Sequence, residues 1–138
     1  MVSFMLFHIP WIMVIVAAVV GLMLGTLWYS PFLLGDRWAR LVGAPVDQNV
    51  AMTRVMLGAF AVSLAHAYGI AWLLERTHAL GLINALVITG MVSVLFVGSH
   101  MVSGILWEHR SLELALINFG STLLCYAAMA LLFVYTAI

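Results

Sequence analysis

The sequence predicts an all-α membrane protein, a four-transmembrane-helix bundle with a short interfacial helix in its first connection. Of its 138 residues, 66% are hydrophobic and only 7% are charged, whereas soluble domains carry about 25% charged residues. Four apolar runs reach the ~20 residues that a helix needs to cross a bilayer core of ~30 Å. No segment alternates with period two as a barrel strand does. We therefore predict one integral domain over residues 1–138.

The first span is predicted at residues 9–29, where Pro10 suits the first helical turn. Residues 1–8 carry no Lys or Arg, and the apolar run is too long for a cleaved signal peptide, so we expect a retained helix. The other spans are predicted at residues 52–74, 82–107 and 112–135. Each run is apolar around most of its circumference, as a lipid-exposed helix requires.

The connection after the first span contains two break signals. Ser30-Pro31 is expected to end the first helix, because proline disfavours helical geometry in the residue before it. Gly35-Asp36 then predicts a break followed by a helix N-cap. A short helix is expected over about residues 36–43, where a glycine stops it.

This short helix is predicted to lie in the membrane interface. Its Trp38 face would dip into the membrane, while Arg37 and Arg40 would lie near anionic headgroups. Two interpretations of the surrounding aromatic block stay open: an anchor at the membrane boundary, or a rigid docking surface for a partner or a lipid headgroup. The residues of this block are Trp28, Tyr29, Pro31, Arg37, Trp38 and Arg40.

The arginines predict the orientation. Arg37, Arg40 and Arg54 flank the first connection and Arg110 lies in the third, whereas only Arg76 lies in the second. The positive-inside rule then places connections one and three in the cytoplasm and both termini outside. We expect a multi-pass protein of the bacterial inner (cytoplasmic) membrane.

The two cytoplasmic connections are also expected to form an ion pair. Arg37 or Arg40 would pair with Glu108 or Glu113 and hold the first connection against the third. Exposed pairs of this kind contribute only about 0–1 kcal/mol each.

Composition and motifs exclude several functions. Five Arg balanced by five acidic residues leave no basic patch, so no nucleic-acid partner is expected. Without a nucleophile–base pair, phosphate loop or zinc-protease motif, an enzyme for soluble substrates is not expected. A membrane enzyme acting on a lipid or quinone-like substrate stays open. No metal site is predicted, and the single Cys125 is interpreted as a small buried hydrophobe.

Each span carries one stripe of polar or small residues, which serves either helix packing or a ligand or solute pathway. On the third span, Ser93, His100 and Ser103 follow helical spacing and are expected to share one face with Thr89 and Gly104. The ligand or pathway candidates are Ser63, His66, Ser93, His100, Ser103, Asn118 and Thr122. The glycines expected at close helix contacts are Gly21, Gly25, Gly58 and Gly69.

The two membrane histidines are the sharpest functional candidates, because no Asp, Glu or Arg lies in the middle of any span. From the predicted spans, His66 and His100 would be separated by roughly 14 Å along the membrane normal. One metal shared by both in a single chain is therefore not expected. They could instead be successive proton carriers in a proton path, axial ligands to separate haems or pigments, or partners in interhelical hydrogen bonds.

The run Gly25–Trp38, Gly-Thr-Leu-Trp-Tyr-Ser-Pro-Phe-Leu-Leu-Gly-Asp-Arg-Trp, resembles the signature of an uncharacterised bacterial family of small four-helix membrane proteins, known only as a domain of unknown function. The segments Trp107–Arg110 and Leu116–Gly120 are similar to that family's acidic–basic turn and Leu-Ile-Asn-x-Gly helix. This chain departs from the pattern at Leu34, often Phe, and at Asp36, often Lys. The resemblance implies a fold and a bacterial membrane location, but no activity.

Three functions remain as hypotheses. The first is a non-enzymatic packing, accessory or hydrophobic-ligand-binding module, present as a homo-oligomer or as a subunit of a larger membrane complex. The second is a small-solute or proton-linked transporter or channel that uses His66 and His100. The third is haem, pigment or quinone binding through one membrane histidine. No cofactor is predicted as a fixed component.

Overall fold

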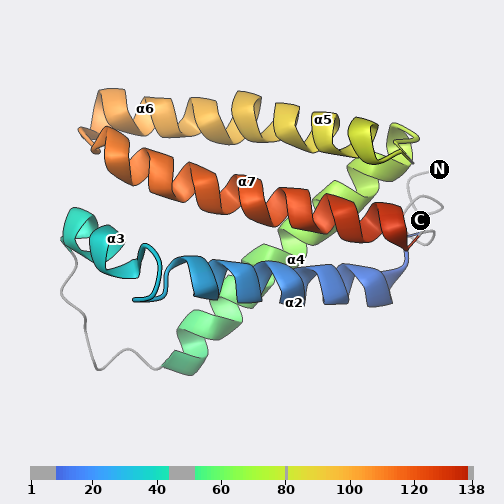
Figure 1. Cartoon of the computed structure of the whole chain (residues 1–138), viewed down its shortest axis with the longest axis horizontal. Coiled ribbons are helices and arrows are strands. Elements are labelled where there is room, and N and C mark those ends of the chain that lie inside the picture. The colour runs from blue at the N-terminus through green and yellow to red at the C-terminus, as the bar shows by residue number, and fades with distance from the viewer. Residues whose placement is uncertain (1–8, 44–51, 80, 137–138) are drawn as a thin grey trace.

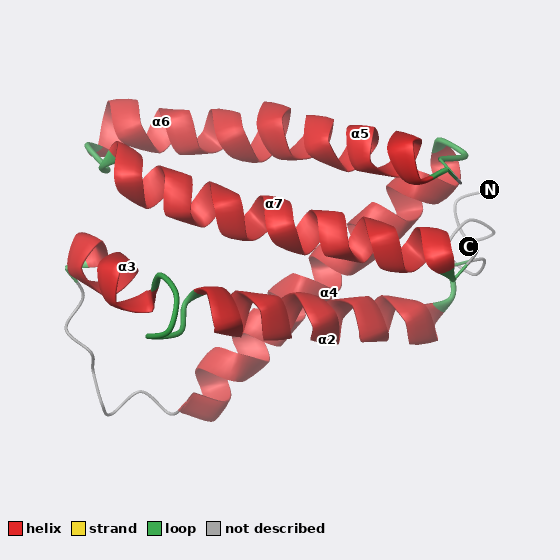
Figure 2. Cartoon of the chain, viewed as in Figure 1, coloured by secondary structure: helices red, strands yellow, loops and turns green. Residues whose placement is uncertain are grey.

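The computed structural model describes residues 9–43, 52–79 and 81–136, and all regular elements in these ranges are helices (Figure 2). Four of these are long and apolar enough to cross a membrane: α2 (Trp11–Trp28), α4 (Met52–Arg76), the continuous α5–η1–α6 helix (Leu82–Glu108) and α7 (Leu112–Tyr135). The short α3 (Gly35–Val42) lies in the first connection. The predicted all-α fold with four long helices is confirmed, because hydrophobic length alone indicates such spans.

The long helices are arranged around α7. The α5–α6 helix and α2 lie on either side of α7, and α4 crosses behind them at an angle (Figure 1). Because of this crossing, the buried residues of α4 begin only at Ser63, near the middle of the helix. Residues 52–62 of α4 have no buried side chain.

The core lies where α2, α4 and α7 meet, and small side chains bring these helices close together. It includes Ala17, Ala18, Ala67, Ala71, Met129, Ala130 and Phe133. The Ser63 hydroxyl of α4 donates a hydrogen bond of 2.7 Å to the Ala18 carbonyl of α2. Such small residues permit close helix approach, and a hydroxyl bonded across the contact adds to it.

The first connection follows the predicted breaks with one correction. Helix α2 ends at Trp28, and α3 begins at Gly35 with Leu34 as its N-cap, so the prediction of Asp36 as the N-cap is wrong. The turn closes tightly: a Cβ on Gly35 would lie 2.3 Å from the Tyr29 carbonyl oxygen. Only glycine fits there, and its N–H donates to the carbonyl of Ser30 at 3.0 Å.

Two smaller expectations concern helix ends. Pro10 lies just before α2 rather than in its first turn, and its carbonyl accepts hydrogen bonds from the Met13 and Val14 amides. Gly43 ends α3 in the left-handed conformation, with φ of 63°, as predicted.

The third long helix contains a π-helical segment, η1 (Ser93–Gly98), and this contradicts the predicted single stripe. Thr89, Ser93 and Gly104 are buried, whereas His100 and Ser103 are exposed. A π-helix has i→i+5 hydrogen bonds and uses more residues per turn than an α-helix. The residues after it are therefore rotated away from the face that regular α-helical spacing predicts.

Candidate functional site

Two of the three segments that carry the family resemblance meet at one end of the bundle. The Trp28 indole N–H donates a 3.1 Å hydrogen bond to the Ile117 carbonyl, and the Tyr29 hydroxyl donates one of 2.9 Å to the Asn118 side-chain oxygen. A Cβ on Gly120 would lie 2.9 Å from Cζ2 of Trp28. Glycine there leaves room for the indole. We call these five residues the boundary junction.

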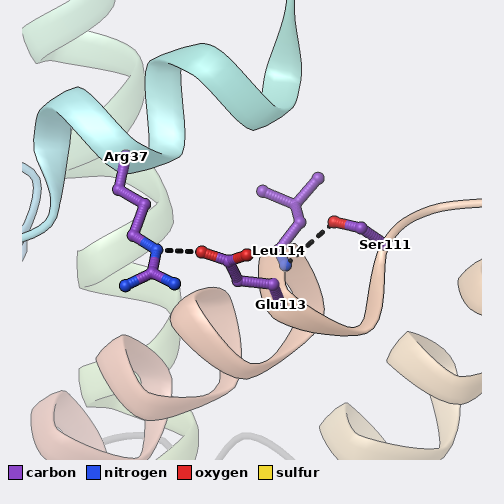
Figure 3. Close-up of polar contacts among 4 residues, drawn as sticks. All are labelled: Arg37, Ser111, Glu113 and Leu114. Carbon is purple, nitrogen blue, oxygen red and sulfur yellow. Dashed lines mark hydrogen bonds and ion pairs between the residues drawn. The ribbon is translucent and has the colours of Figure 1, made fainter.

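Helix α3 is tied to the same end of α7. The Tyr29 and Trp38 rings pack edge to face with their centroids 5.4 Å apart. Arg37 points from α3 toward the first turn of α7, where its Nε donates to the Glu113 carboxylate (Figure 3). The predicted ion pair between the first and third connections is therefore confirmed in one of its possible pairings. Both side chains are substantially exposed, so the pair contributes about 0–1 kcal/mol.

The start of α7 is capped by Ser111, whose hydroxyl oxygen accepts a 3.1 Å hydrogen bond from the Leu114 amide (Figure 3). This side chain satisfies one of the amides that a helix N-terminus leaves unpaired. The cap helps to place Glu113 opposite Arg37 on the first turn of α7.

The remaining residues of the aromatic block differ in accessibility. Pro31 and Arg40 are exposed, and neither makes a hydrogen bond or an ion pair within the described ranges. Burial raises the pKa of Tyr29, because the charged phenolate loses more solvation than the neutral phenol when water is excluded. The block thus combines intramolecular anchors with two residues free to meet lipid or a partner, and the docking interpretation stays a prediction.

A second cluster surrounds His66. A groove of about 290 Å³ lies between α4, α5 and α7. Its walls include Gly69, Trp72, Thr89, Val92 and Tyr126. The His66 and Tyr126 rings pack edge to face with their centroids 5.2 Å apart.

The His66 imidazole is a polar group that this groove can offer to a ligand. The Thr89 hydroxyl is already engaged, because it donates to the Ala85 carbonyl of its own helix at 2.8 Å. The His66 side chain forms no hydrogen bond within the residues that the structure describes. The imidazole can therefore donate or accept one hydrogen bond in otherwise apolar surroundings.

Comparison with known proteins supplies the family. A family model described as a protein of unknown function, DUF1761, matches residues 12–134. The chain belongs to this family. The match covers both the boundary junction and the His66 groove, and the family description assigns no activity. Neither the curated proteins nor the solved structures gave a match.

Several other predicted site residues of this DUF1761 domain have hydroxyls that bond to backbone carbonyls. Ser93 donates to Thr89 at 2.8 Å, and Thr122 donates to Asn118 at 3.1 Å. Together with the Ser63 bond to α2, these contacts serve the helices themselves and leave no hydroxyl proton for a ligand. The structure does not bring His100 or Ser103 into the His66 groove.

The four predicted packing glycines behave differently. A Cβ on Gly21 would collide with Met129 and Ser63, so this glycine lies at a close contact. Gly25, Gly58 and Gly69 would meet nothing within 4 Å. Of these four glycines, Gly21 is the one that lies at a close contact among the described residues, and the packing role of the other three stays a prediction. Opposite Gly21, the Cys125 thiol donates to its carbonyl at 3.5 Å, and the thiol is only partly buried.

Sequence reasoning missed Trp72 and Tyr126 as walls of the groove. Tyr126 follows Thr122 by four residues and Asn118 by eight, so the polar face of the fourth span extends to it by helical spacing. Trp72 lies near the end of the second predicted span, where a tryptophan is expected to anchor the helix at the membrane boundary. Its place in the groove depends on how α4 crosses α5, and no sequence pattern encodes that angle.

Proposed function

We propose that this DUF1761 member is a non-enzymatic integral membrane module that binds a hydrophobic ligand in the groove beside His66. The observation that carries the proposal is an imidazole without a hydrogen-bond partner among the described residues, in an apolar groove. His66 lies two residues past the midpoint of α4, or about 3 Å along its axis. Lipid tails offer no hydrogen-bonding group at that depth.

The walls of the groove suggest the kind of ligand. Trp72, Tyr126 and His66 present ring faces and edges, which favour a flat apolar ring. A volume of about 290 Å³ is at the lower limit of small-molecule pockets, which run from about 300 to 1,000 Å³. We propose a lipid-soluble ring compound with a carbonyl or hydroxyl oxygen, a quinone-like head, rather than a haem or pigment macrocycle.

One observation favours ligand binding over transport. The transport hypothesis needs His66 and His100 along one path. Both histidines are exposed, and the walls of the groove include His66 but not His100. A binding site needs only the first of these histidines.

We also propose that the module lies in a bacterial cytoplasmic membrane with both termini outside. Helix α3 and the α6–α7 turn lie at one end of the bundle, while α2 begins and α7 ends at the other (Figure 1). The first end carries Arg37, Arg40 and Arg110, and the second carries Arg76. Because arginines are more frequent on the cytoplasmic side, this difference supports a cytoplasmic location for the end that carries α3 and the α6–α7 turn. Labelling of an added cysteine beside Arg40 from the outside of intact cells would contradict the orientation.

The binding proposal can be tested with a short-chain benzoquinone as the probe. Trp72 lines the groove, so saturable quenching of its fluorescence is expected, and Trp72→Phe should abolish that component. His66→Leu should weaken binding about 2- to 10-fold, because one hydrogen bond contributes about 0.5–1.5 kcal/mol.

The matched control for this experiment is His100→Leu, which removes the other membrane histidine and should leave the dissociation constant unchanged. Quenching that does not saturate, or that persists in full in Trp72→Phe, would count against the groove as the binding site. A haem-type absorption band in the purified protein would count against a quinone-like ligand.

A further inference from the structure

The outward face of α6 (Ser99–Glu108) carries two polar side chains that bond to no other residue that the structure describes. The α5–α6 helix forms one edge of the bundle, with α7 on its inner side (Figure 1). His100 and Ser103 are both exposed, and within the described ranges neither forms a hydrogen bond or an ion pair. The adjacent Ser99 differs, because its hydroxyl donates to the Phe96 carbonyl at 3.1 Å.

The π-helical segment is what turns these side chains outward. His100 follows Ser93 by seven residues, which in a regular α-helix is about two turns and returns to the same face. Ser93 is fully buried, so regular spacing would also place His100 toward the bundle. The π-helix η1 lies between them, and such segments are rare and occur frequently at functional sites.

Both side chains lie at a depth where lipid offers no hydrogen-bond partner. His100 and Ser103 precede the helix end at Glu108 by eight and five residues. At the α-helical rise, these separations are about 12 Å and about 8 Å. Polar groups that face hydrocarbon without a partner are costly, and in membrane proteins they pair with other polar groups. This face therefore needs a polar cover.

We propose that the cover is a second copy of this chain, packed α6 against α6 around a twofold axis along the membrane normal. Such an axis keeps every residue at its own depth, so the two His100 side chains and the two Ser103 side chains meet at matching levels. A neutral imidazole has one donor and one acceptor, so the N–H of one His100 can donate to the ring nitrogen of the other without a third component. Phe96 and Leu106 are exposed on the same helix and supply apolar contact around the pair.

This interface is separate from the proposed ligand site. The groove is lined from α4, α5 and α7, whereas the proposed contact uses α6. Failure of one proposal therefore leaves the other standing, and different histidine variants report on the two.

Disulfide cross-linking tests the contact directly. In a Cys125→Ala background, Ser103→Cys should form a covalent dimer on mild oxidation in liposomes, because an interface residue near the axis brings its counterpart within disulfide range. The matched control is Met23→Cys on α2, which is 65% exposed and also lies five residues before its helix end. The proposal is overturned if Ser103→Cys cross-links no more than Met23→Cys.

The dimer equilibrium gives a second measurement. In single-molecule photobleaching across a range of protein-to-lipid ratios, we expect a wild-type dimer that His100→Leu weakens about tenfold, since the hydrogen bond between the two imidazoles is lost. His66→Leu should leave the dimer unchanged, and unaltered helical circular dichroism should show that both variants fold. A monomeric wild-type chain, or a dimer that His100→Leu does not weaken, overturns the proposal.

Discussion

The indole N–H of Trp28 donates a hydrogen bond of 3.1 Å to the carbonyl oxygen of Ile117, which lies 89 residues away in the chain. Trp28 is the last residue of α2, and Ile117 lies in the second turn of α7. The bond therefore fixes the end of one long helix against the beginning of another. Beside it, the bond from Tyr29 to Asn118 repeats the connection one residue further along both segments.

We expect Trp28→Phe to lower the free energy of unfolding by about 1–2 kcal/mol, because the hydrogen bond is lost while most of the ring contact remains. The measurement is reversible unfolding in detergent micelles, followed by circular dichroism. Trp107→Phe is the control, since Trp107 is 81% exposed and its replacement should change stability by less than about 0.5 kcal/mol. Equal effects of the two substitutions would contradict the role assigned to Trp28.

Gly120→Ala should destabilise the protein by about 1–3 kcal/mol, because the added methyl would collide with the Trp28 indole. Gly58→Ala is the matched control: it also lies inside a long helix, but its Cβ would meet open space. Alanine there should stabilise by up to about 1 kcal/mol through helix propensity. The same unfolding assay gives both values, and a neutral or stabilising Gly120→Ala would show that the indole can move aside.

The Arg37–Glu113 pair should show a small, salt-sensitive coupling. A double-mutant cycle with Arg37→Gln and Glu113→Gln is expected to give about 0.2–1 kcal/mol at low ionic strength. The coupling should fall as salt rises toward 1 M, where the screening length is only about 3 Å. A coupling that persists unchanged at high salt would mean that the pair is shielded from water in the membrane-embedded protein.

Removal of the α7 cap by Ser111→Ala should cost about 0.5–2 kcal/mol, because the Leu114 amide loses its acceptor. Ser111→Asp keeps an acceptor oxygen at the same place and adds a charge that the helix N-terminus favours, so it should restore the stability. Thermal unfolding of the three proteins decides the point. If aspartate is as destabilising as alanine, the loss does not come from capping.

Tyr29 predicts a dependence of stability on high pH. Burial raises the pKa of this phenol above its ordinary value of about 10, so the folded chain holds the proton more tightly than the unfolded chain. The resulting stabilisation is fully present below the unfolded-state pKa and is lost as the pH rises through the folded-state pKa. Unfolding free energies measured between about pH 8 and pH 11 should fall less steeply in Tyr29→Phe. An identical slope in both proteins would contradict the raised pKa.

The sequence alone determined the number of the long helices and their ends to within two residues. Apolar length, the Ser30-Pro31 break and the Gly43 stop are local signals, and the structure follows each of them. The ion pair between the first and third connections was also predictable as a small set of candidate residues. Each long helix crosses the whole bundle, so the first and third connections lie at the same end.

Only the tertiary structure decided which faces meet. Trp28 pairs with Ile117, Gly21 rather than Gly25 lies at a close contact, and His66 and Tyr126 share a groove. A helix that is apolar on all sides has no hydrophobic stripe to indicate its inner face, so side-chain shape and crossing angle select the contacts. The π-helical segment also rotates the residues that follow it. His100 is therefore exposed, although helical spacing predicts that it shares a face with the buried Ser93.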